Sequence, residues 1–513
     1  MRRPSRRAVS RTASIAAPVG GLNARDAIAG MPETDAVVMD NWFPDVAGVS
    51  LRAGSADWST GYPAPVETLM GYKSGATSKL FAAAGTAIYD ATNGGTVGAA
   101  VVSGVTNARW QRTLFGTPGG MFLIAVNGAD SLRRYDGTTW LALNGASTPA
   151  ITGVATSLLI QVNVFKQRLW FVEKDSMRVW YLPVDSVSGA LVSIDFGSRF
   201  KLGGTMLFMT TITINNSYGI DDYAAFITSE GEVAVYKGID PANAATWSLV
   251  GIFRIGRPIG VRSYFKLAGD VIMITADGFV SLEKTALLDR NEKQTAISDK
   301  IVNAATADTS TYRANFGWEG IVHPLNNKLI FNVPTSTTTS YQYVMNQINN
   351  SWCRFLGWNA NCFELLNDVL YYGGATAVVK ADTGTNDNGA AIIADCLPAY
   401  SYFRVRGQKR FTMCRPILSC TIQPVANLEL YTDFNTTPVG NSILLFQDSS
   451  GPRWGATLWN RVLWRPGTPR QYADWYSLSG TGFAASLRFR VEAKNVTLAW
   501  SSTDVVYEPG GVL

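Results

Sequence analysis

The feature that most constrains the fold of this chain is a recurring pair of short apolar strands, joined by a polar or glycine-containing turn. The pattern occurs seven times, and the units begin at Lys79, Gly120, Gln167, Tyr223, Gly269, Asn326 and Asn367. Their first strands start about 40 to 58 residues apart, which is near the span of a four-stranded propeller blade. The spacing predicts an all-β protein with a β-propeller of about six to eight blades.

The unit that begins at Gly269 shows why these strands must pack together. Its first strand, "DVIMI", is continuously apolar, as expected for a strand that is covered on both faces. In the turn that follows, Asp277 can satisfy nearby backbone amides and Gly278 can adopt a positive φ. Because one hairpin cannot bury its own apolar face, we expect the units to stack radially. Trp-Asp and kelch signatures are missing, and "YDGTTW" at Tyr135 matches a sialidase-type Asp box only in part.

Length and a change of sequence texture predict more than one domain. A chain of 513 residues is too long for one ordinary hydrophobic core. Beyond residue 390 the hairpin units give way to longer alternating strands. We expect a flexible basic arm over residues 1–25, an N-terminal strand segment over residues 26–60 that packs with the C-terminal domain, the propeller over residues 61–390, and a strand-rich platform over residues 391–513.

The platform contains two alternating runs, "AYSYFRVRGQKRFTMCRPILSCTIQ" and "FAASLRFRVEAKNVTLAWSS". In the second run Leu487, Phe489 and Val491 share one face, and Arg488 and Arg490 share the other. A segment rich in Trp and Arg, residues 451–475, lies between the two runs. Trp and Arg are enriched at protein interfaces, although ordinary packing explains such a segment equally well.

Positive charge is concentrated at the N-terminus. Six arginines precede the first acidic residue, Asp26, and they are Arg2, Arg3, Arg6, Arg7, Arg11 and Arg25. Subtracting these six from the net charge of +5 leaves −1 for the remainder. The arm lacks the continuous apolar core of a secretory signal. It is either a solvated terminus or an arm that becomes ordered against a neighbouring subunit, an adaptor or nucleic acid.

The chain offers little catalytic or metal-binding chemistry. Its one histidine, His323, stands just before a proline at the entry to a predicted turn, and we interpret it as a loop or strand-end residue. Five cysteines without a C-x-x-C pair indicate buried free thiols in a reducing cytoplasm. Phosphate-loop, nucleophile-elbow and H-E-x-x-H motifs are missing. Asp221, Asp222 and the acids of "TSEGEV" are interpreted as solvated hairpin tips. We therefore predict no catalytic, cofactor-binding or metal-binding residues.

The stretch "DAVVMDNWFPDVAGVSLRAGS" carries a family resemblance. It has an Asn, an apolar-aromatic step, a Pro, a Gly and a following Arg-x-Gly, which here are Asn41, Trp42, Phe43, Pro44, Gly48, Arg52 and Gly54. With the hairpin units and the strand-rich end, this pattern resembles the tail nozzle proteins of short-tailed bacteriophages, also called tail tubular protein B or packaged-DNA stabilisation proteins.

The resemblance implies a structural virion protein, not an enzyme, that needs no cofactor. It implies a homo-oligomeric ring, a hexamer, below the head–tail adaptor, with tail fibres or tailspikes as further partners. Phage DNA would pass through the channel without specific binding, and the protein would be assembled in the host cytoplasm and reside in the virion tail. The interface residues predicted on this basis are Arg2, Arg3, Arg6, Arg7, Arg11, Trp42, Phe43, Pro44, Arg404, Arg406, Arg488 and Arg490.

Two other classes of function fit a propeller. A receptor-binding module would bind host cells as an isolated protein without forming a ring. A glycan-degrading enzyme would carry convergent carboxylates in a propeller pocket and would turn over a surface polysaccharide. For the nozzle, we expect channel-facing residues to be mainly neutral or acidic, because each neutralised phosphate adds salt-sensitive affinity that slows DNA transit.

Overall fold

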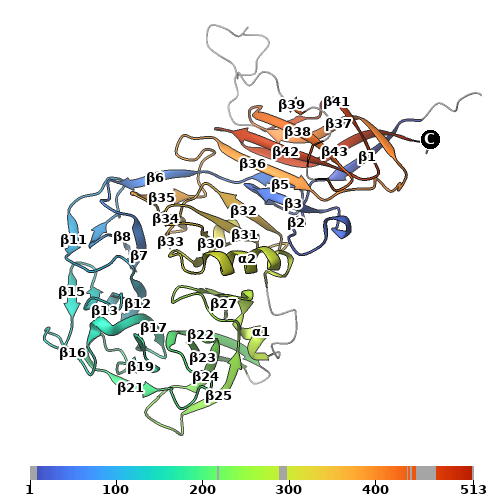
Figure 1. Ribbon diagram of the computed structural model, residues 1–513. Coiled ribbons are helices and arrows are strands. Elements are labelled where there is room, and N and C mark those ends of the chain that lie inside the picture. The colour runs from blue at the N-terminus through green and yellow to red at the C-terminus, as the bar shows by residue number, and fades with distance from the viewer. Residues whose placement is uncertain are drawn as a thin grey trace, which may run out of the picture.

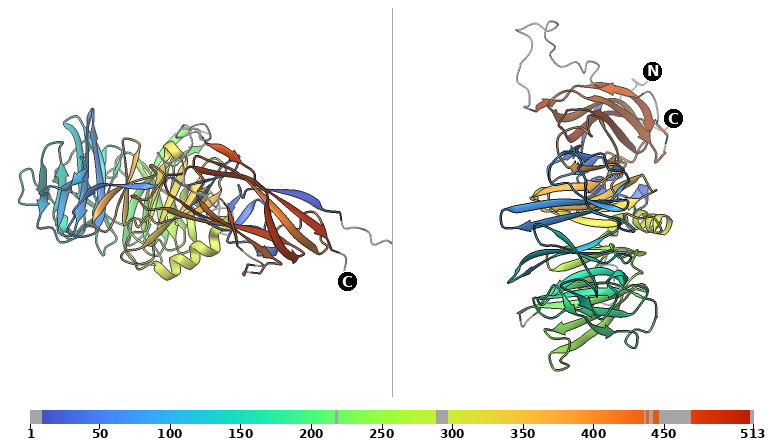
Figure 2. Two further views of the ribbon diagram at one scale, coloured as in Figure 1. Left: turned by 90° about the horizontal axis from the view of Figure 1, so that it is seen from above. Right: turned by 90° about the vertical axis from the view of Figure 1, so that its left-hand side faces the viewer.

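The computed structural model describes residues 9–216, 219–287, 297–435, 437–438, 442–445 and 469–510. This part of the chain is almost entirely β-structure, and it forms a propeller with a β-sandwich beside it (Figure 1). Seen from above, the two lobes lie end to end (Figure 2). The predicted all-β fold with a propeller is confirmed.

Six sheets form blades around the propeller axis. The first two consist of β7 (Val66–Ser74), β8 (Thr77–Ala84), β9 (Ala87–Asp90) and β11 (Ala100–Ser103), and of β12 (Gln111–Thr117), β13 (Gly120–Val126), β14 (Leu132–Tyr135) and β15 (Trp140–Leu143). The next two consist of β17 (Leu159–Phe165), β18 (Arg168–Glu173), β19 (Arg178–Tyr181) and β21 (Val192–Asp195), and of β22 (Met206–Asn216), β23 (Gly219–Thr228), β24 (Glu232–Gly238) and β25 (Trp247–Arg254). The fifth has three strands, β26 (Tyr264–Leu267), β27 (Asp270–Thr275) and β28 (Gly278–Ser281).

The sixth blade joins strands from both ends of the propeller sequence. It contains β33 (Cys362–Leu366), β34 (Val369–Gly373), β35 (Ala377–Ala381), β6 (Ser55–Thr60) and β10 (Gly95–Thr96). Because β6 pairs antiparallel with β35, an early strand closes a late blade. The strand β6 lies within the segment 26–60 that was expected to pack with the C-terminal domain, and it belongs to the propeller instead. A small parallel pair, β16 (Ile151–Thr152) and β20 (Gly189–Ala190), connects two loops.

A four-stranded meander fills the ring between the fifth and sixth blades. It consists of β29 (Glu319–His323), β30 (Lys328–Pro334), β31 (Ser340–Asn346) and β32 (Trp352–Leu356). Its first strand contacts β26 on one side and β33 on the other. Beyond β32 the same sheet continues through β2 (Gly21–Leu22), β3 (Asp35–Asp40), β36 (Ile392–Pro398), β42 (Ala485–Ala493), β38 (Val425–Thr432) and β39 (Ile443–Leu445). One ten-stranded sheet thus runs from the propeller into the platform.

A second sheet completes the sandwich. It contains β4 (Trp42–Pro44), β5 (Val49–Leu51), β43 (Leu498–Pro509), β37 (Lys409–Cys420), β40 (Arg470–Tyr472), β1 (Arg11–Ala16) and β41 (Tyr476–Gly482). Two α-helices lie in the described part of the chain, α1 (Leu282–Leu287) and α2 (Val302–Tyr312). The second helix packs beside β28 and β30, where its Asp308 accepts hydrogen bonds from Tyr341 and Tyr343.

The largest apolar core crosses the boundary between the lobes. It includes Phe331 and Trp352 from the meander, Trp42 from β4, and Phe489 and Trp500 from the platform. Smaller clusters fill the spaces between neighbouring blades. Because the main core is shared, the propeller and the sandwich support each other's packing.

Two sequence predictions are wrong in this region. The arm was expected to be flexible through residue 25, but β1 pairs antiparallel with β43 over six residues. The free backbone groups of β43 and the apolar contacts of Ala13 and Ile15 fix this segment. The alternating run from Ala399 was expected to be one strand, but β37 begins only at Lys409. Phe403 and Arg404 adopt positive φ values, 51° and 61°, and so interrupt the run.

Candidate functional site

The residues of the N-terminal pattern meet at the junction between the propeller and the sandwich. Asn41, with a φ of 61°, lies at the centre of this junction and bonds to three separate segments. Its amide nitrogen donates to the carbonyl of Ile393 at 2.7 Å. Its oxygen accepts from Arg52 Nε and from the Leu356 amide, both at 2.7 Å. One side chain therefore ties β36, β32 and the segment that leads into the propeller.

The Arg52 side chain is fully buried, and acceptors surround its guanidinium group. Two of its nitrogens bond to the two carboxylate oxygens of Asp387 at 2.9 and 2.5 Å. Further bonds reach the carbonyls of Leu356 at 2.7 Å and Ala53 at 2.9 Å. The guanidinium also lies 5.2 Å from the ring centroid of Trp358. Such bidentate and stacked contacts suit arginine and not lysine.

The three aromatic and proline positions fill the space at this junction. Trp42 is buried, and its ring lies 5.5 Å from that of Phe489 and 6.1 Å from that of Trp500. Phe43 is half-buried in β4, and the carbonyl of Pro44 accepts a bond from Asn346 at 2.9 Å. These residues, predicted at a contact between subunits, hold two lobes of one chain together.

The two glycines of the pattern are required by close backbone approach. A Cβ at Gly48 would lie 2.7 Å from the carbonyl oxygen of Trp500. One at Gly54 would lie 1.9 Å from the carbonyl oxygen of Asn386. Neither contact leaves room for a side chain. Packing at this junction thus accounts for the whole pattern.

The predicted arginines lie at different places on the platform. Arg488 and Arg490 both bond to Asp395, at 2.6 and 3.2 Å, on the face opposite the buried Phe489. Arg404 and Arg406 are exposed in the turn before β37, and Arg11 is exposed at the start of β1. Arg2, Arg3, Arg6 and Arg7 lie outside the described residues, as do residues 451–468 of the segment rich in Trp and Arg.

Near the propeller axis, ion pairs join the innermost strands. Arg112 of β12 bonds to Glu364 of β33 at 2.5 Å and lies 4.0 Å from Glu319 of β29. It also donates to the carbonyl of Phe363 at 3.1 Å. Burial raises the pKa of Glu364, although the charge of Arg112 opposes that shift. These contacts connect three separate sheets at the centre of the ring.

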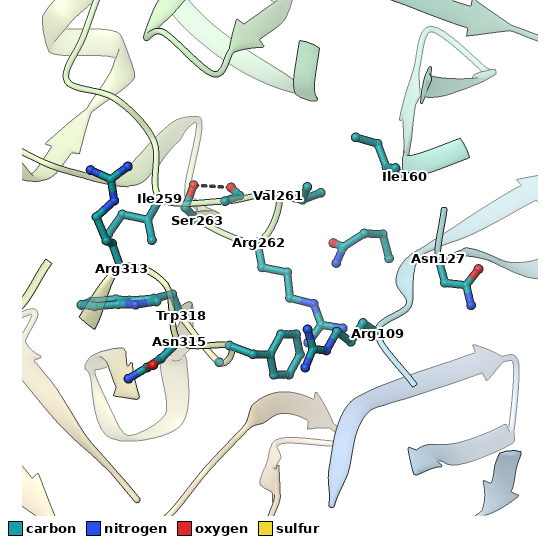
Figure 3. Close-up of a pocket in the computed structure, with 14 residues that line it drawn as sticks. Arg109, Asn127, Ile160, Ile259, Val261, Arg262, Ser263, Arg313, Asn315 and Trp318 are labelled. Carbon is teal, nitrogen blue, oxygen red and sulfur yellow. Dashed lines mark hydrogen bonds between the residues drawn. The ribbon is translucent and has the colours of Figure 1, made fainter. Parts of the chain in front are cut away.

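Beside this cluster lies a cavity of about 260 Å³ that loops from several blades surround (Figure 3). Its walls are formed by Arg109, Gln111, Asn127, Ile160, Ile259, Gly260, Val261, Arg262, Ser263, Arg313, Asn315, Phe316, Gly317 and Trp318. In Figure 3, Trp318 and Asn315 lie on one side, and the guanidinium groups of Arg109 and Arg262 lie close together on the other. The cavity combines apolar walls with a few convergent polar groups, which is typical of a ligand site.

The two cavity arginines differ in their partners. Arg109 is paired with Glu67 at 3.0 Å. Arg262 donates to the Glu67 carbonyl at 2.7 Å, to the Thr68 hydroxyl and to the Trp110 carbonyl at 2.8 Å, all of which are neutral acceptors. Burial lowers the pKa of Arg262, and the charge of a nearby glutamate only partly offsets this effect. The cavity therefore has more positive than negative charge.

Sequence reasoning missed this cavity. Most of its residues come from loops that lie before β12, after β13, before β26 and before β29, and Gln111 and Ile160 lie on β12 and β17, so no local motif contains them. The only advance signal was the propeller itself, since the loops of a ring of blades converge at its axis.

The histidine and acid predictions have mixed outcomes. His323 is buried at the end of β29, where Nδ1 lies 3.3 Å from Asp382 Oδ2, so its strand-end position is confirmed. Asp221 and Asp222 lie within β23 and pair with Lys237 and Lys166, so their assignment to a hairpin tip is wrong. Lys237 lies on the neighbouring strand β24, and Lys166 lies in the turn after β17.

The prediction of buried free thiols is confirmed, because all five cysteines are buried and free. Within the described ranges, no three His, Cys, Asp or Glu residues are grouped so that they could hold a metal ion. The same ranges contain no helix that is long and apolar enough to cross a membrane.

Comparison with known proteins yields structural matches only. No protein-family model and no curated protein sequence matches the chain. The BBS1N structure in complex with ARL6DN has a TM-score of 0.38 and 10% identity, over 66% of this chain and 99% of that one. YCF48 bound to D1 peptide has a TM-score of 0.34 and 8% identity, over 68% and 98%. A sialidase from Trypanosoma rangeli in complex with the inhibitor DANA has a TM-score of 0.29 and 10% identity, over 78% and 91%.

Proposed function

We propose that this chain is a structural virion protein that forms the tail nozzle ring of a short-tailed bacteriophage. The observation that carries the proposal is the junction around Asn41 and Arg52. The stretch that resembles the nozzle family is also the stretch that locks the propeller to the sandwich. Each residue of the pattern meets a packing requirement of the two-lobed subunit. We therefore infer that chains with this pattern share the two-lobed architecture.

A ring subunit needs a rigid body and a surface for its neighbours. Rigidity is provided by the ten-stranded sheet and by the core shared between the lobes. We place the subunit contacts on the platform, where Arg404 and Arg406 are exposed. Both described chain ends, β1 and β43, also lie at this end of the molecule (Figure 1).

The DNA channel in this proposal runs between copies of the chain and not through a propeller. Arg112, Glu319 and Glu364 join the innermost strands across each propeller axis. A duplex could pass there only if these strands separated. Six copies around a common axis, attached below the head–tail adaptor, would instead enclose a channel for DNA retention and ejection. Tail fibres or tailspikes are further proposed partners, in a virion tail assembled in the host cytoplasm.

The test is negative-stain imaging of the purified protein, alone and mixed with its adaptor ring. We expect rings with six-fold symmetry and a central opening, at least in the mixture. Charge-reversed Arg404→Glu/Arg406→Glu protein serves as the interface variant, and Arg178→Gln, on a blade, is its matched control. Particles that remain single in both samples, with a folded protein, would overturn the nozzle proposal.

A receptor-binding propeller is the second candidate, and the axial cavity favours it. Arg109, Arg262 and Trp318 line a space that could hold part of a ligand. A glycan-degrading enzyme would use the same space, but no Asp or Glu is among the lining residues. Binding to host cells by single subunits would support the receptor role, and turnover of a surface polysaccharide would support the enzyme.

A further inference from the structure

The axial cavity contains two guanidinium groups that stack on one aromatic ring. Arg109 lies 4.3 Å and Arg262 lies 5.0 Å from the ring centroid of Phe316. Among the described residues, Glu67 is the only carboxylate that bonds directly to either guanidinium. Two positive charges held close together repel each other unless an anion compensates them. Their fixed position makes the cavity suitable for a small anion.

Arg262 has an unused hydrogen-bond donor. Its two terminal nitrogens bond to β7 and to the loop before β12, but its Nε has no partner in the described part of the chain. This nitrogen is itself buried, and its positive charge density adds to the positive potential of this wall because no acceptor compensates it. An anionic oxygen is the strongest acceptor for a guanidinium.

The rest of the cavity indicates what carries the anion. Trp318 has its indole nitrogen bonded to the carbonyl of Tyr312 at 3.0 Å, so the orientation of the indole is fixed. The Gln111 carboxamide has no hydrogen-bond partner among the described residues, and it can bond to hydroxyl groups. Isoleucine and valine side chains complete the walls. An aromatic surface, a free amide and a volume of about 260 Å³ suit one ligand ring.

We propose that this cavity binds a carboxylate-bearing sugar ring, that is, one acidic monosaccharide unit. Arg109 and Arg262 hold the carboxylate, Gln111 bonds to ring hydroxyls, and Trp318 packs against the apolar edge of the ring. Binding in this cavity does not depend on ring formation by the chain. It therefore stands or falls separately from the nozzle proposal.

The test is calorimetric titration of the purified full-length protein with three probes. Sodium glucuronate has both a ring and a carboxylate, glucose has only the ring, and sodium acetate has only the carboxylate. We expect glucuronate to bind at least roughly tenfold more tightly than either other probe, because charge-assisted bonds and ring packing act together. Equal binding of glucose or of acetate, or no binding of glucuronate, would overturn the proposal.

Variants locate the site. Arg109→Gln removes a half-exposed guanidinium without breaking the loop contacts of Arg262, and it should weaken glucuronate binding roughly tenfold. Arg178→Gln is the matched control, because Arg178 is exposed on a blade, 3.7 Å from Asp195, and away from the cavity. Circular dichroism establishes that both variants are folded. Loss of binding in the control, or unchanged binding in Arg109→Gln, would place the ligand elsewhere.

Discussion

Arg52 and Asp387 are far apart in the sequence and form a bidentate ion pair at the junction of the propeller and the sandwich, with distances of 2.9 and 2.5 Å. Arg52 precedes β6, the strand that closes the sixth blade, and Asp387 follows β35, the partner of β6. The pair therefore links the two chain segments that connect the lobes, the one from β5 to β6 and the one from β35 to β36. Because the Arg52 side chain is fully buried, the Asp387 carboxylate replaces the water that would otherwise solvate the guanidinium.

Replacing Arg52 should destabilise the whole chain. The variant Arg52→Met leaves the Asp387 carboxylate and several backbone carbonyls without their partner. Removing one member of a buried ion pair costs about 3–5 kcal/mol. Denaturant unfolding of Arg52→Met measures this loss, and Arg178→Gln, from an exposed pair, should change stability by less than about 1 kcal/mol. Equal stability of Arg52→Met and the unchanged protein would contradict a role for the pair in locking the lobes.

The variant Gly54→Ala tests whether the close contact between the backbones of Gly54 and Asn386 is needed for stability. The new methyl group would lie 1.9 Å from the Asn386 carbonyl oxygen, so the backbone must shift. We expect a loss of about 1–3 kcal/mol, or failure to fold, because overpacking strains the junction. Gly98→Ala is the matched control, since no heavy atom lies within 4 Å of its added Cβ. Its effect should stay within about 0.5 kcal/mol in the same unfolding experiment.

The sequence predicted the parts of this fold that depend on local pattern. The hairpin beginning at Gly269 is present as β27 and β28, because an apolar run and an Asp-Gly turn specify it locally. The continuation of the meander into the platform was not predictable. It depends on pairing between β32 and β3, where Asp40 pairs with Arg354, and neighbouring sequence does not encode such distant contacts. The cavity was missed for the same reason, because five segments that are distant in the sequence build it.

The N-terminal arm shows a second reason why sequence-based prediction fails. Charge and low hydrophobicity predicted disorder through residue 25, yet Ala13 and Ile15 pack on the core once β43 offers an edge. Sequence composition describes what a segment can bury by itself, and it does not show what a partner strand provides.

Asp382 should make stability depend on acidic pH. Burial alone would raise its pKa, but the neighbouring His323 ring, the charge of Lys328 and hydrogen bonds from Lys328 and Asn326 hold the pKa well below the usual range. A carboxyl whose folded-state pKa is lowered stabilises the fold fully above its unfolded pKa, about 4, and loses that contribution as the pH falls below it. The variant Asp382→Asn should be less stable by about 3 kcal/mol at neutral pH.

The check is unfolding of both proteins from pH 7 down to about 3. The stability difference between Asp382→Asn and the unchanged protein should shrink below pH 4, since protonation removes the same charge. Asp195→Asn, from the exposed pair with Arg178, should show almost no difference at any pH. A difference that stays constant into acid would show that the charge of Asp382 is not responsible.

Charge reversal separates the platform arginines into two classes. Arg488 and Arg490 share Asp395, so reversing either one should destabilise the chain itself. Arg404 and Arg406 are exposed in a turn, so Arg404→Glu/Arg406→Glu should leave the melting temperature nearly unchanged. If these two arginines face a neighbouring subunit, the folded variant should still form fewer rings in negative-stain images. Normal ring yield would remove them from the proposed interface.

The last prediction concerns DNA. A conduit for duplex DNA must not bind it tightly, because each phosphate neutralised by Lys or Arg adds salt-sensitive affinity. Several arginines at or beside the platform are already compensated: Arg354 of the meander with Asp40, and on the platform Arg415 with Asp504, and Arg488 and Arg490 with Asp395. We therefore expect fluorescence anisotropy at physiological salt to give a dissociation constant for duplex DNA no tighter than about 10⁻⁶ M. A protein without residues 1–8 is the control. Tight binding that is lost with residues 1–8 would assign DNA contact to the four arginines there, and tight binding that persists would contradict a sliding channel.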